Sequence, residues 1–361
     1  MTMKPIQPTS RFVQMYQVGF VIIVILIFLS VMSMSIKEQG SGKFEETFFP
    51  RNVLIQYFNR LRIKLGDRVF NKVLIGKNGW MEYTGGRNLD DYQNVLSFSP
   101  KDLRSAGQAI RSCYEYAQEQ GFTFLMVVAP NKASIYSDKL PDQIRPLSNL
   151  SRLDQLNNYL RTENIPQVLD LRPALRNARN WQDTYYPVGT HWNAYGAYIA
   201  YDAIINVLAQ NHPNLETYSA EFFRFRTISP DKSLTRDKDI ALLIKANHLV
   251  PEKAVFSTRN LNGLVHKVEY PEAAFGYHEM SWIPEADLPT LLIFHDSFGN
   301  ANLNDYLSLN FSRSFFVHRN SAYLYLNKAI IKQFSPDIVI YQVVERDLKA
   351  IQDDLSGCAA K

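Results

Sequence analysis

The chain has 361 residues, of which 46% are hydrophobic and 20% are charged, and its formal net charge at pH 7 is +4. This composition supports a folded core and excludes an intrinsically disordered chain. The net charge is small for this length, and no basic stripe is interleaved with aromatic residues, so the composition also argues against nucleic acid as a partner.

The chain contains two cysteines, Cys113 and Cys358, which lie far apart in sequence. They could in principle pair, but we expect two separate buried thiols. Because neither a Cys-x-x-Cys motif nor a spaced cluster of histidine and cysteine occurs, the sequence predicts no metal site and no cofactor.

An apolar stretch near the N-terminus carries no charge from residue 12 to residue 36. A transmembrane helix needs about 20 apolar residues, whereas the apolar core of a signal peptide has about 7–15. We therefore predict an uncleaved single-pass anchor, with a cleaved signal peptide as the alternative. Lys4 and Arg11 precede the stretch, so we expect the N-terminus in the cytoplasm and the rest of the chain on the periplasmic or extracellular side of the cytoplasmic membrane.

The rest of the chain is expected to form one large domain. The predicted organisation is a cytoplasmic N-terminus with the anchor at residues 1–36, a juxtamembrane linker with a short helix at 37–68, a main domain at 69–350 and a tail at 351–361. Within the main domain, residues 212–288 are less regular in pattern. We interpret them as an insertion over the edge of a sheet, and we expect the tail after Asp354 to be frayed.

Apolar runs and their boundaries predict the elements of the main domain. In chain order they are a hairpin at 73–83, a helix at 100–119 between Ser99 and Gly121, a strand at 122–129, a helix at 148–163, a strand at 167–171, a helix from 194 to about 210, a strand at 291–294, a helix at 302–309, a strand at 314–317, a helix at 322–333 and a strand at 337–344. This alternation predicts an α/β fold, a three-layer domain with a mostly parallel sheet and helices on both faces.

A serine and a histidine are the candidate catalytic residues. Ser297 comes three residues after a predicted strand, at the edge of the sheet where α/β proteins bind their ligands. Gly299 and the helix start that follows offer backbone N–H groups to a developing oxyanion. His191 precedes a helix N-terminus, which favours the neutral imidazole that a general base requires. An N-cap serine and a core histidine remain the alternatives, because spacing alone does not bring the two residues together.

Five blocks follow one another in the main domain: Gly-Lys-Asn-Gly-Trp at 76–80, Ala-Pro-Asn-Lys at 129–132, Thr-His-Trp-Asn at 190–193 with Gly196 and Ala197, Asp-Ser at 296–297, and the stretch from Asp337 to Glu345 and Arg346. As an ordered set spanning about residues 70–350, they resemble the AlgX/AlgJ family of alginate O-acetyltransferases. The Asp-Ser pair also resembles the Gly-Asp-Ser block of SGNH hydrolases, with His295 in place of the glycine. We expect the Asp296 side chain to brace the turn.

The resemblance implies an SGNH hydrolase-like domain that transfers acetyl groups to hydroxyls of an alginate-like cell-surface or exopolysaccharide. It also implies a membrane-bound acyltransferase as the partner that delivers the acetyl group. Ser297 would be the nucleophile that carries the acyl group, and His191 its base. An acetylesterase would use the same residues with water as the acceptor. A Gly-x-Ser-x-Gly elbow of the lipase type is absent.

Several further residues are candidates for the same site. Asn131 could donate to the oxyanion, as an asparagine does in SGNH enzymes, or it could cap the following turn. Lys132 could hold local structure or meet an anionic sugar. Trp192 and Tyr186 could stack on a sugar ring, although aromatic residues more often fill cores.

The chain departs from the family pattern at Gly189, because the family has an aspartate two residues before the histidine. Glycine cannot orient an imidazole. Asp183 is our first candidate for a replacement, and Asp170 and Glu345 are others. A Ser–His dyad oriented by a backbone carbonyl is a further alternative. If the chemistry were lost, the domain would instead bind glycan or serve as a scaffold in a polysaccharide complex.

Overall fold

The computed structural model describes residues 49–228, 237–249, 254–273, 276–318 and 326–359, together with residues 18, 19, 21, 22, 25 and 29. The chain divides into two compact units, residues 1–67 and 68–361. The first unit contains the helix α3, Phe49–Lys64, where a short helix was predicted. The predicted anchor falls almost wholly outside the described residues. Among those that are described, no helix combines the length and the apolar character that a membrane span requires.

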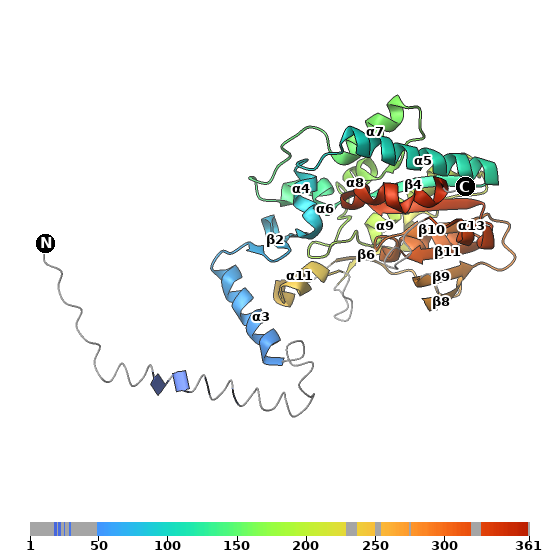
Figure 1. The fold of residues 1–361 in the computed structure, drawn as a ribbon. Helices are drawn as coiled ribbons and strands as arrows, with labels where there is room; N and C mark the ends of the chain where they lie inside the picture. Colours follow the sequence, from blue (N-terminus) through green and yellow to red (C-terminus); the bar gives the residue numbers. More distant parts are fainter. Residues whose placement is uncertain are drawn as a thin grey trace. The chain divides into compact units, whose positions relative to one another are not determined.

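Seven strands form the central sheet of the second unit, in the order β5-β4-β12-β10-β11-β9-β8 (Figure 1). Their bounds are Thr123–Ala129 for β4, Leu169–Asp170 for β5, His266–Ala273 for β8, Gly276–Trp282 for β9, Thr290–His295 for β10, Arg313–His318 for β11 and Ile338–Val344 for β12. The five strands from β5 to β11 run parallel, whereas β9 and β8 are antiparallel. The predicted α/β fold with a mostly parallel sheet is therefore confirmed.

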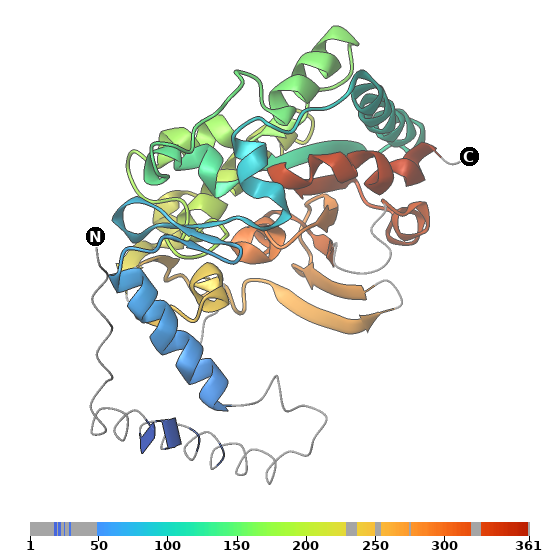
Figure 2. The ribbon, with the colours of Figure 1, turned by 60° about the vertical axis from the view of Figure 1, so that its left-hand side comes forward.

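Two hydrophobic cores lie on opposite faces of this sheet, because successive side chains of a strand point to opposite sides. Along β4, Phe124, Met126 and Val128 enter one core, while Leu125 and Val127 enter the other. Helices α5 (Pro100–Gln120), α7 (Arg152–Thr162), α13 (Lys328–Phe334) and α14 (Ile351–Asp354) cover the first face, and α8 (Arg172–Ala178), α9 (Ala194–Leu208) and α12 (Asn304–Leu307) cover the second. The three layers can be followed in Figures 1 and 2.

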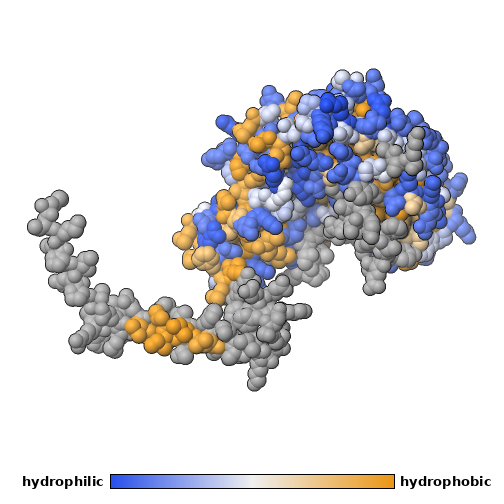
Figure 3. All heavy atoms as spheres, in the orientation of Figure 1, coloured by the Kyte–Doolittle hydropathy of each residue, from blue (hydrophilic) through white to orange (hydrophobic). Residues whose placement is uncertain are grey.

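Helix α5 shows how the sequence sets element boundaries. Its N-terminus is closed by a capping box, in which the Ser99 hydroxyl accepts from the Asp102 backbone N–H and the Asp102 carboxylate accepts from the Ser99 N–H. Gly121 ends the helix in the left-handed region at φ 79°. Ala106, Ile110 and other small or apolar residues at helical spacing face the sheet. The outer surface over α5 and α7 is mostly hydrophilic, drawn blue in Figure 3.

Smaller elements complete the fold. They are β1 (Val69–Phe70), β2 (Val73–Ile75) and β3 (Met81–Tyr83) in one antiparallel sheet, β6 (Phe225–Ile228) and β7 (Ala254–Ser257) in another, and the short helices α4 (Asn88–Tyr92), α6 (Lys132–Ile135), α10 (Ala220–Phe223), α11 (Asp239–Leu243) and α15 (Ser356–Ala359). The predicted hairpin at 73–83 is the β2–β3 pair. The predicted helix at 302–309 begins instead as a π-helical turn, Gly299–Leu303, which leads into α12.

The stretch at 212–288 differs from the predicted insertion over the sheet edge. Its strands β8 and β9 extend the central sheet itself, paired through β9 to β11. The same stretch supplies β6, β7 and the short helix α11. The strands of this stretch carry polar residues between apolar ones, as in His-Lys-Val-Glu-Tyr of β8 and Phe-Arg-Thr-Ile of β6, so their pattern is weaker than that of the buried parallel strands.

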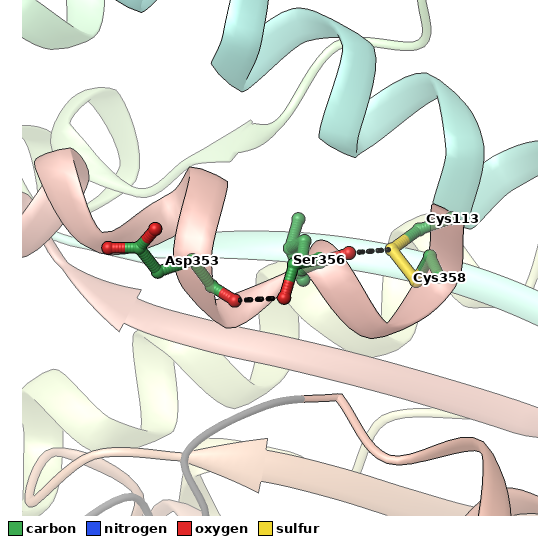
Figure 4. Close-up of a disulfide and its surroundings, with 5 residues drawn as sticks. Cys113, Asp353, Ser356 and Cys358 are labelled. Atoms are coloured by element: carbon green, nitrogen blue, oxygen red, sulfur yellow. Dashed lines mark hydrogen bonds between the residues drawn. A yellow bond between two sulfur atoms is a disulfide. The ribbon is translucent and has the colours of Figure 1, made fainter. Parts of the chain in front are cut away.

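A disulfide joins Cys113 on α5 to Cys358 on α15, with the two Cα atoms 4.9 Å apart (Figure 4). The prediction of two separate thiols was therefore wrong, and so was the prediction of a frayed tail. Separation along the chain, 245 residues here, carries no information about separation in space. Burial of Ile351 and Leu355 in the core beneath α5 brings the tail alongside that helix.

Replacing both cysteines with serine should lower the free energy of unfolding by about 2–5 kcal/mol, because the cross-link restricts a very long loop in the unfolded chain. Urea unfolding followed by circular dichroism measures this. Dithiothreitol should lower the stability of the wild-type protein similarly and leave the double variant unchanged. An unfolding midpoint that neither change moves would show that the bond contributes nothing.

Candidate active site

The structure brings Ser297 and His191 into contact. Ser297 lies in the turn directly after β10, and His191 lies in the segment that leads into α9. The distance between His191 Nε2 and Ser297 Oγ is 2.9 Å. The His191 side chain is 12% exposed, so the pair is largely buried but still accessible from solvent. A serine hydroxyl in contact with an imidazole nitrogen is the arrangement that nucleophilic acyl transfer requires.

The Asp296 carboxylate holds the turn that carries Ser297. It accepts hydrogen bonds from the Phe298 backbone N–H (2.9 Å), the Gln342 side-chain amide (3.1 Å) and the Val344 backbone N–H (2.6 Å). Two of these donors belong to β12, the neighbouring strand, so the turn is tied to the sheet. The carboxylate therefore braces the turn, as expected. Burial raises the pKa of Asp296, and these hydrogen bonds act in the opposite direction.

Hydrogen bonds and ring contacts around the segment that leads into α9 hold His191 in place. Asn193 caps α9, with its side-chain oxygen accepting from the Gly196 N–H at 3.0 Å. Trp192 is fully buried, and its indole N–H donates to the Ala301 carbonyl at 2.9 Å. Phe298 packs against the rings of both Trp192 and His191. The proposed sugar-stacking role of Trp192 is thus corrected, because a fully buried ring has no face for a ligand.

Among the residues that the structure describes, the carboxylate nearest to the other ring nitrogen of His191 belongs to Asp239. Its Oδ2 lies 3.7 Å from His191 Nδ1, while its Oδ1 accepts from the backbone N–H groups of Thr190 (2.7 Å) and Ile240 (2.9 Å). Asp239 is the first residue of α11, in the stretch predicted as an insertion. Burial raises its pKa, and the hydrogen bonds from Thr190 and the charge of Lys132 act in the opposite direction.

The acids that the sequence suggested for this position lie elsewhere. Asp183 accepts from the Tyr136 hydroxyl at 3.2 Å, and Asp170 is paired with Arg172. Glu345 accepts from the Asn131 backbone N–H and the Ser134 hydroxyl. No sequence pattern pointed to Asp239, because 49 residues separate it from Thr190. Only the packing of α11 against the segment that carries His191 brings the two residues together.

Lys132 is a buried support of the histidine segment. Its ammonium group donates to the carbonyl of Gly189 at 2.6 Å and to those of Tyr186 and Pro187 at 3.3 Å. Burial lowers the pKa of Lys132 to about 8, against the charges of Glu82 and Asp239. Of the two predicted roles, the structural one fits, since the ammonium group is occupied by the backbone. Tyr186 is only 5% exposed, so its predicted stacking on sugar is corrected too.

The two predicted oxyanion donors are committed to other partners. The Asn131 amide donates to the Asp91 carboxylate at 2.9 Å, and the Gly299 backbone N–H donates to the Asp296 carbonyl at 3.0 Å. Gly299 has a packing role, because a Cβ there would lie 2.3 Å from His295 Nδ1. Within the described part of the chain, the backbone N–H of Ser297 itself donates to no acceptor.

A polar cavity of about 470 Å³ opens at the same edge of the sheet. Residues that line it include Asp91, Tyr92, Ser134, Arg172, Arg176 and Glu345. They come from α4, α6, α8 and the turn after β12, and α4, α6 and α8 lie close together (Figure 1). Arg346 follows Glu345 and places its guanidinium 6.0 Å from the centre of the Phe298 ring. Phe298 is the chain neighbour of Ser297, whereas Ser297, His191 and Phe298 are not among the residues that line the cavity.

A family model described as the SGNH hydrolase-like domain of the acetyltransferase AlgX matches residues 73–262. This range contains His191 and Asp239 but ends before Ser297. No curated protein resembles the chain closely enough in sequence to count as a match.

Several solved structures are similar to this chain. PatB1 from Bacillus cereus has a TM-score of 0.55 at 17% identity, covering 76% of this chain and 96% of that one. A DHHW family protein from Eubacterium siraeum has a TM-score of 0.53 at 15% identity, covering 80% and 97%. The O-acetyltransferase domain of Pseudomonas putida AlgJ has a TM-score of 0.49 at 17% identity, covering 77% and 92%. At such identities the likeness to PatB1 and the DHHW protein concerns the fold alone.

Asp296→Ala should lower the free energy of unfolding by about 2–5 kcal/mol, because three donors around the serine turn lose their acceptor. Asp287→Ala, which removes an exposed carboxylate a few residues upstream, should change it by about 0.5 kcal/mol or less. Urea unfolding of both variants makes the comparison. Equal stability of the two would mean that the turn does not depend on this carboxylate.

Proposed function

The chain belongs to the AlgX family of SGNH hydrolase-like acetyltransferase domains, and we propose that it transfers acetyl groups to hydroxyls of a cell-surface or exopolysaccharide of the alginate-like class. The observation that carries the proposal is the 2.9 Å contact between His191 Nε2 and Ser297 Oγ at the carboxyl edge of the sheet. Family membership supplies the reaction class, and this contact supplies the nucleophile and the base.

The proposed reaction has two halves. Ser297 Oγ attacks the acetyl carbonyl of a donor while its proton passes to His191 Nε2, and the leaving group departs with that proton. A sugar hydroxyl then attacks the acyl-serine, His191 takes the hydroxyl proton, and the Ser297 oxygen recovers it as the acyl bond breaks. The backbone N–H of Ser297, which donates to no acceptor within the described residues, serves as a donor to the oxyanion in both halves.

We place the acceptor sugar in the polar cavity that Glu345 lines at the carboxyl edge of the sheet. Its volume of about 470 Å³ lies within the usual range for small-molecule sites. Arg176 donates to the Ser134 carbonyl through Nε, and within the described residues its guanidinium forms no ion pair, so its other N–H groups can bind sugar oxygens. The acids of the cavity are already bonded, Asp91 to Arg152 and Glu345 to Ser134.

Two further parts of the proposal concern location and partner. The disulfide between Cys113 and Cys358 supports an oxidising compartment, such as the periplasm or the exterior, for the main domain. The apolar stretch at 12–36 supports an anchor in the cytoplasmic membrane. A membrane-bound acyltransferase that exports acetyl groups would then be the donor partner. An acetylesterase remains the variant in which water replaces the sugar as acceptor.

Ser297→Ala should abolish both acetyl transfer to polysaccharide and covalent labelling by a serine-reactive phosphonate, because no other group replaces the nucleophile. Ser105→Ala, on α5, serves as the matched control and should behave as wild type. Transfer to an added oligosaccharide, compared with release of free acetate, separates transferase from esterase. A wild-type protein that the phosphonate does not label would favour the scaffold alternative.

Arg176→Ala should raise the KM for the oligosaccharide acceptor about tenfold, the equivalent of one charge-assisted hydrogen bond. Hydrolysis of p-nitrophenyl acetate should stay unchanged, because the acyl-serine forms without the acceptor. Arg104→Ala, an exposed arginine on α5, is the control. An unchanged acceptor KM would show that the sugar binds outside this cavity.

A further inference from the structure

The histidine of an acyl-transfer site needs a group on its second nitrogen, and the usual family position for that group is occupied by Gly189. The carboxylate that faces His191 Nδ1 instead comes from Asp239, 48 residues further along the chain (239 − 191). The distance of 3.7 Å from Nδ1 to Oδ2 is an ion-pair distance. It is longer than a hydrogen bond, and catalytic hydrogen bonds are often long in the unliganded protein and tighten only in the substrate or transition-state complex.

Backbone groups of residues 188–190 fix the position of Asp239. The Thr190 N–H donates to its Oδ1 at 2.7 Å, and the Ala241 N–H donates to the Val188 carbonyl at 3.2 Å. These two hydrogen bonds clamp the start of α11 onto residues 188–190, directly before the histidine. Ile240 and Ala241 are fully buried, so the start of α11 is anchored by packing as well. Asp239 is therefore held to the histidine segment independently of the ion pair.

The charges around Asp239 suit a carboxylate that stays ionised. Lys132 exerts an attractive charge on it, and the Lys132 ammonium group also holds the carbonyl of Gly189 at 2.6 Å. The Lys132 charge in turn interacts with buried Glu82. One lysine thus supports both the turn before His191 and the carboxylate that faces its ring. The Asp239 side chain is 34% exposed, which lowers the cost of keeping it charged.

We propose that Asp239 is the positioning residue that orients His191 for acyl transfer, in place of the missing acid at position 189. This inference rests on the proposed function of Ser297 and His191. As the bond from Ser297 Oγ to the acetyl carbon forms, Nε2 takes the serine proton and the ring becomes an imidazolium. Asp239 Oδ2 accepts the Nδ1–H and remains ionised throughout. When the bond to the leaving group breaks, Nε2 returns its proton to that group.

The same arrangement explains how the chain tolerates glycine at 189. Residues 237–249 supply the carboxylate from outside the motif, through α11. The Gly189 carbonyl meanwhile accepts from the Lys132 ammonium group, which anchors the turn before His191. The acid and the histidine therefore come from separate segments that meet only in the folded domain.

Asp239→Asn tests this role, because the amide oxygen can still accept from Thr190 while the charge is lost. With p-nitrophenyl acetate, kcat should fall about 10²–10⁴-fold with little change in KM, by analogy with removal of the acid from a serine triad. The acid limb of the pH–rate profile should move to lower pH, because a carboxylate stabilises the imidazolium. Asp183→Asn is the matched control and should retain wild-type kcat.

A second measurement separates positioning from mere stability. In the phosphonate adduct of wild type, the His191 Nδ1 proton should give a low-field NMR resonance that Asp239→Asn loses. A kcat within about threefold of wild type, with an unmoved pH profile, would overturn the assignment while leaving the proposed function intact. A wild-type protein without activity or labelling would overturn both.

Discussion

The contact between His191 Nε2 and Ser297 Oγ joins two segments 106 residues apart, and the surrounding structure serves to hold it. The serine is placed by the end of β10 and by the Asp296 carboxylate, which bonds to the neighbouring strand β12. The histidine is placed by the cap of α9 and by the buried ring of Trp192. Phe298, which follows Ser297 in the serine turn, packs against the rings of His191 and Trp192, so movement of either segment would disturb the other.

The parallel strands explain why so many polar groups meet at this place. Asn131 follows β4, Glu345 follows β12 and Ser297 follows β10, and these strands run in the same direction. Their carboxyl ends therefore share one edge, where Ser297 lies and where Glu345 lines the polar cavity. The buried pairs at this edge, such as Arg152 with Asp91, support the shape of the cavity. A ligand in the cavity would contact Arg176, whose guanidinium forms no ion pair within the described residues.

Much of the fold follows from local sequence signals. The β4 and β12 runs are mostly apolar, and Ser99 and Gly121 mark the ends of α5, so these elements are predictable from the chain alone. The contact between serine and histidine was predictable only with the help of family blocks. Asp239 and the disulfide were not, because each joins segments distant in sequence, whose meeting depends on how helices pack. Trp192 is not a ligand contact, because its ring is fully buried. The sequence shows an aromatic residue at this position but not the neighbours that bury it.

The central claim is that the acetyl group passes through Ser297. Incubation of the wild-type protein with p-nitrophenyl acetate, rapid acid quenching and peptide mapping by mass spectrometry test it directly. The account predicts one acetyl group on the peptide that contains Ser297, lost again when an acceptor oligosaccharide is added before quenching. Turnover of the ester with no acetyl group on that peptide would contradict the account.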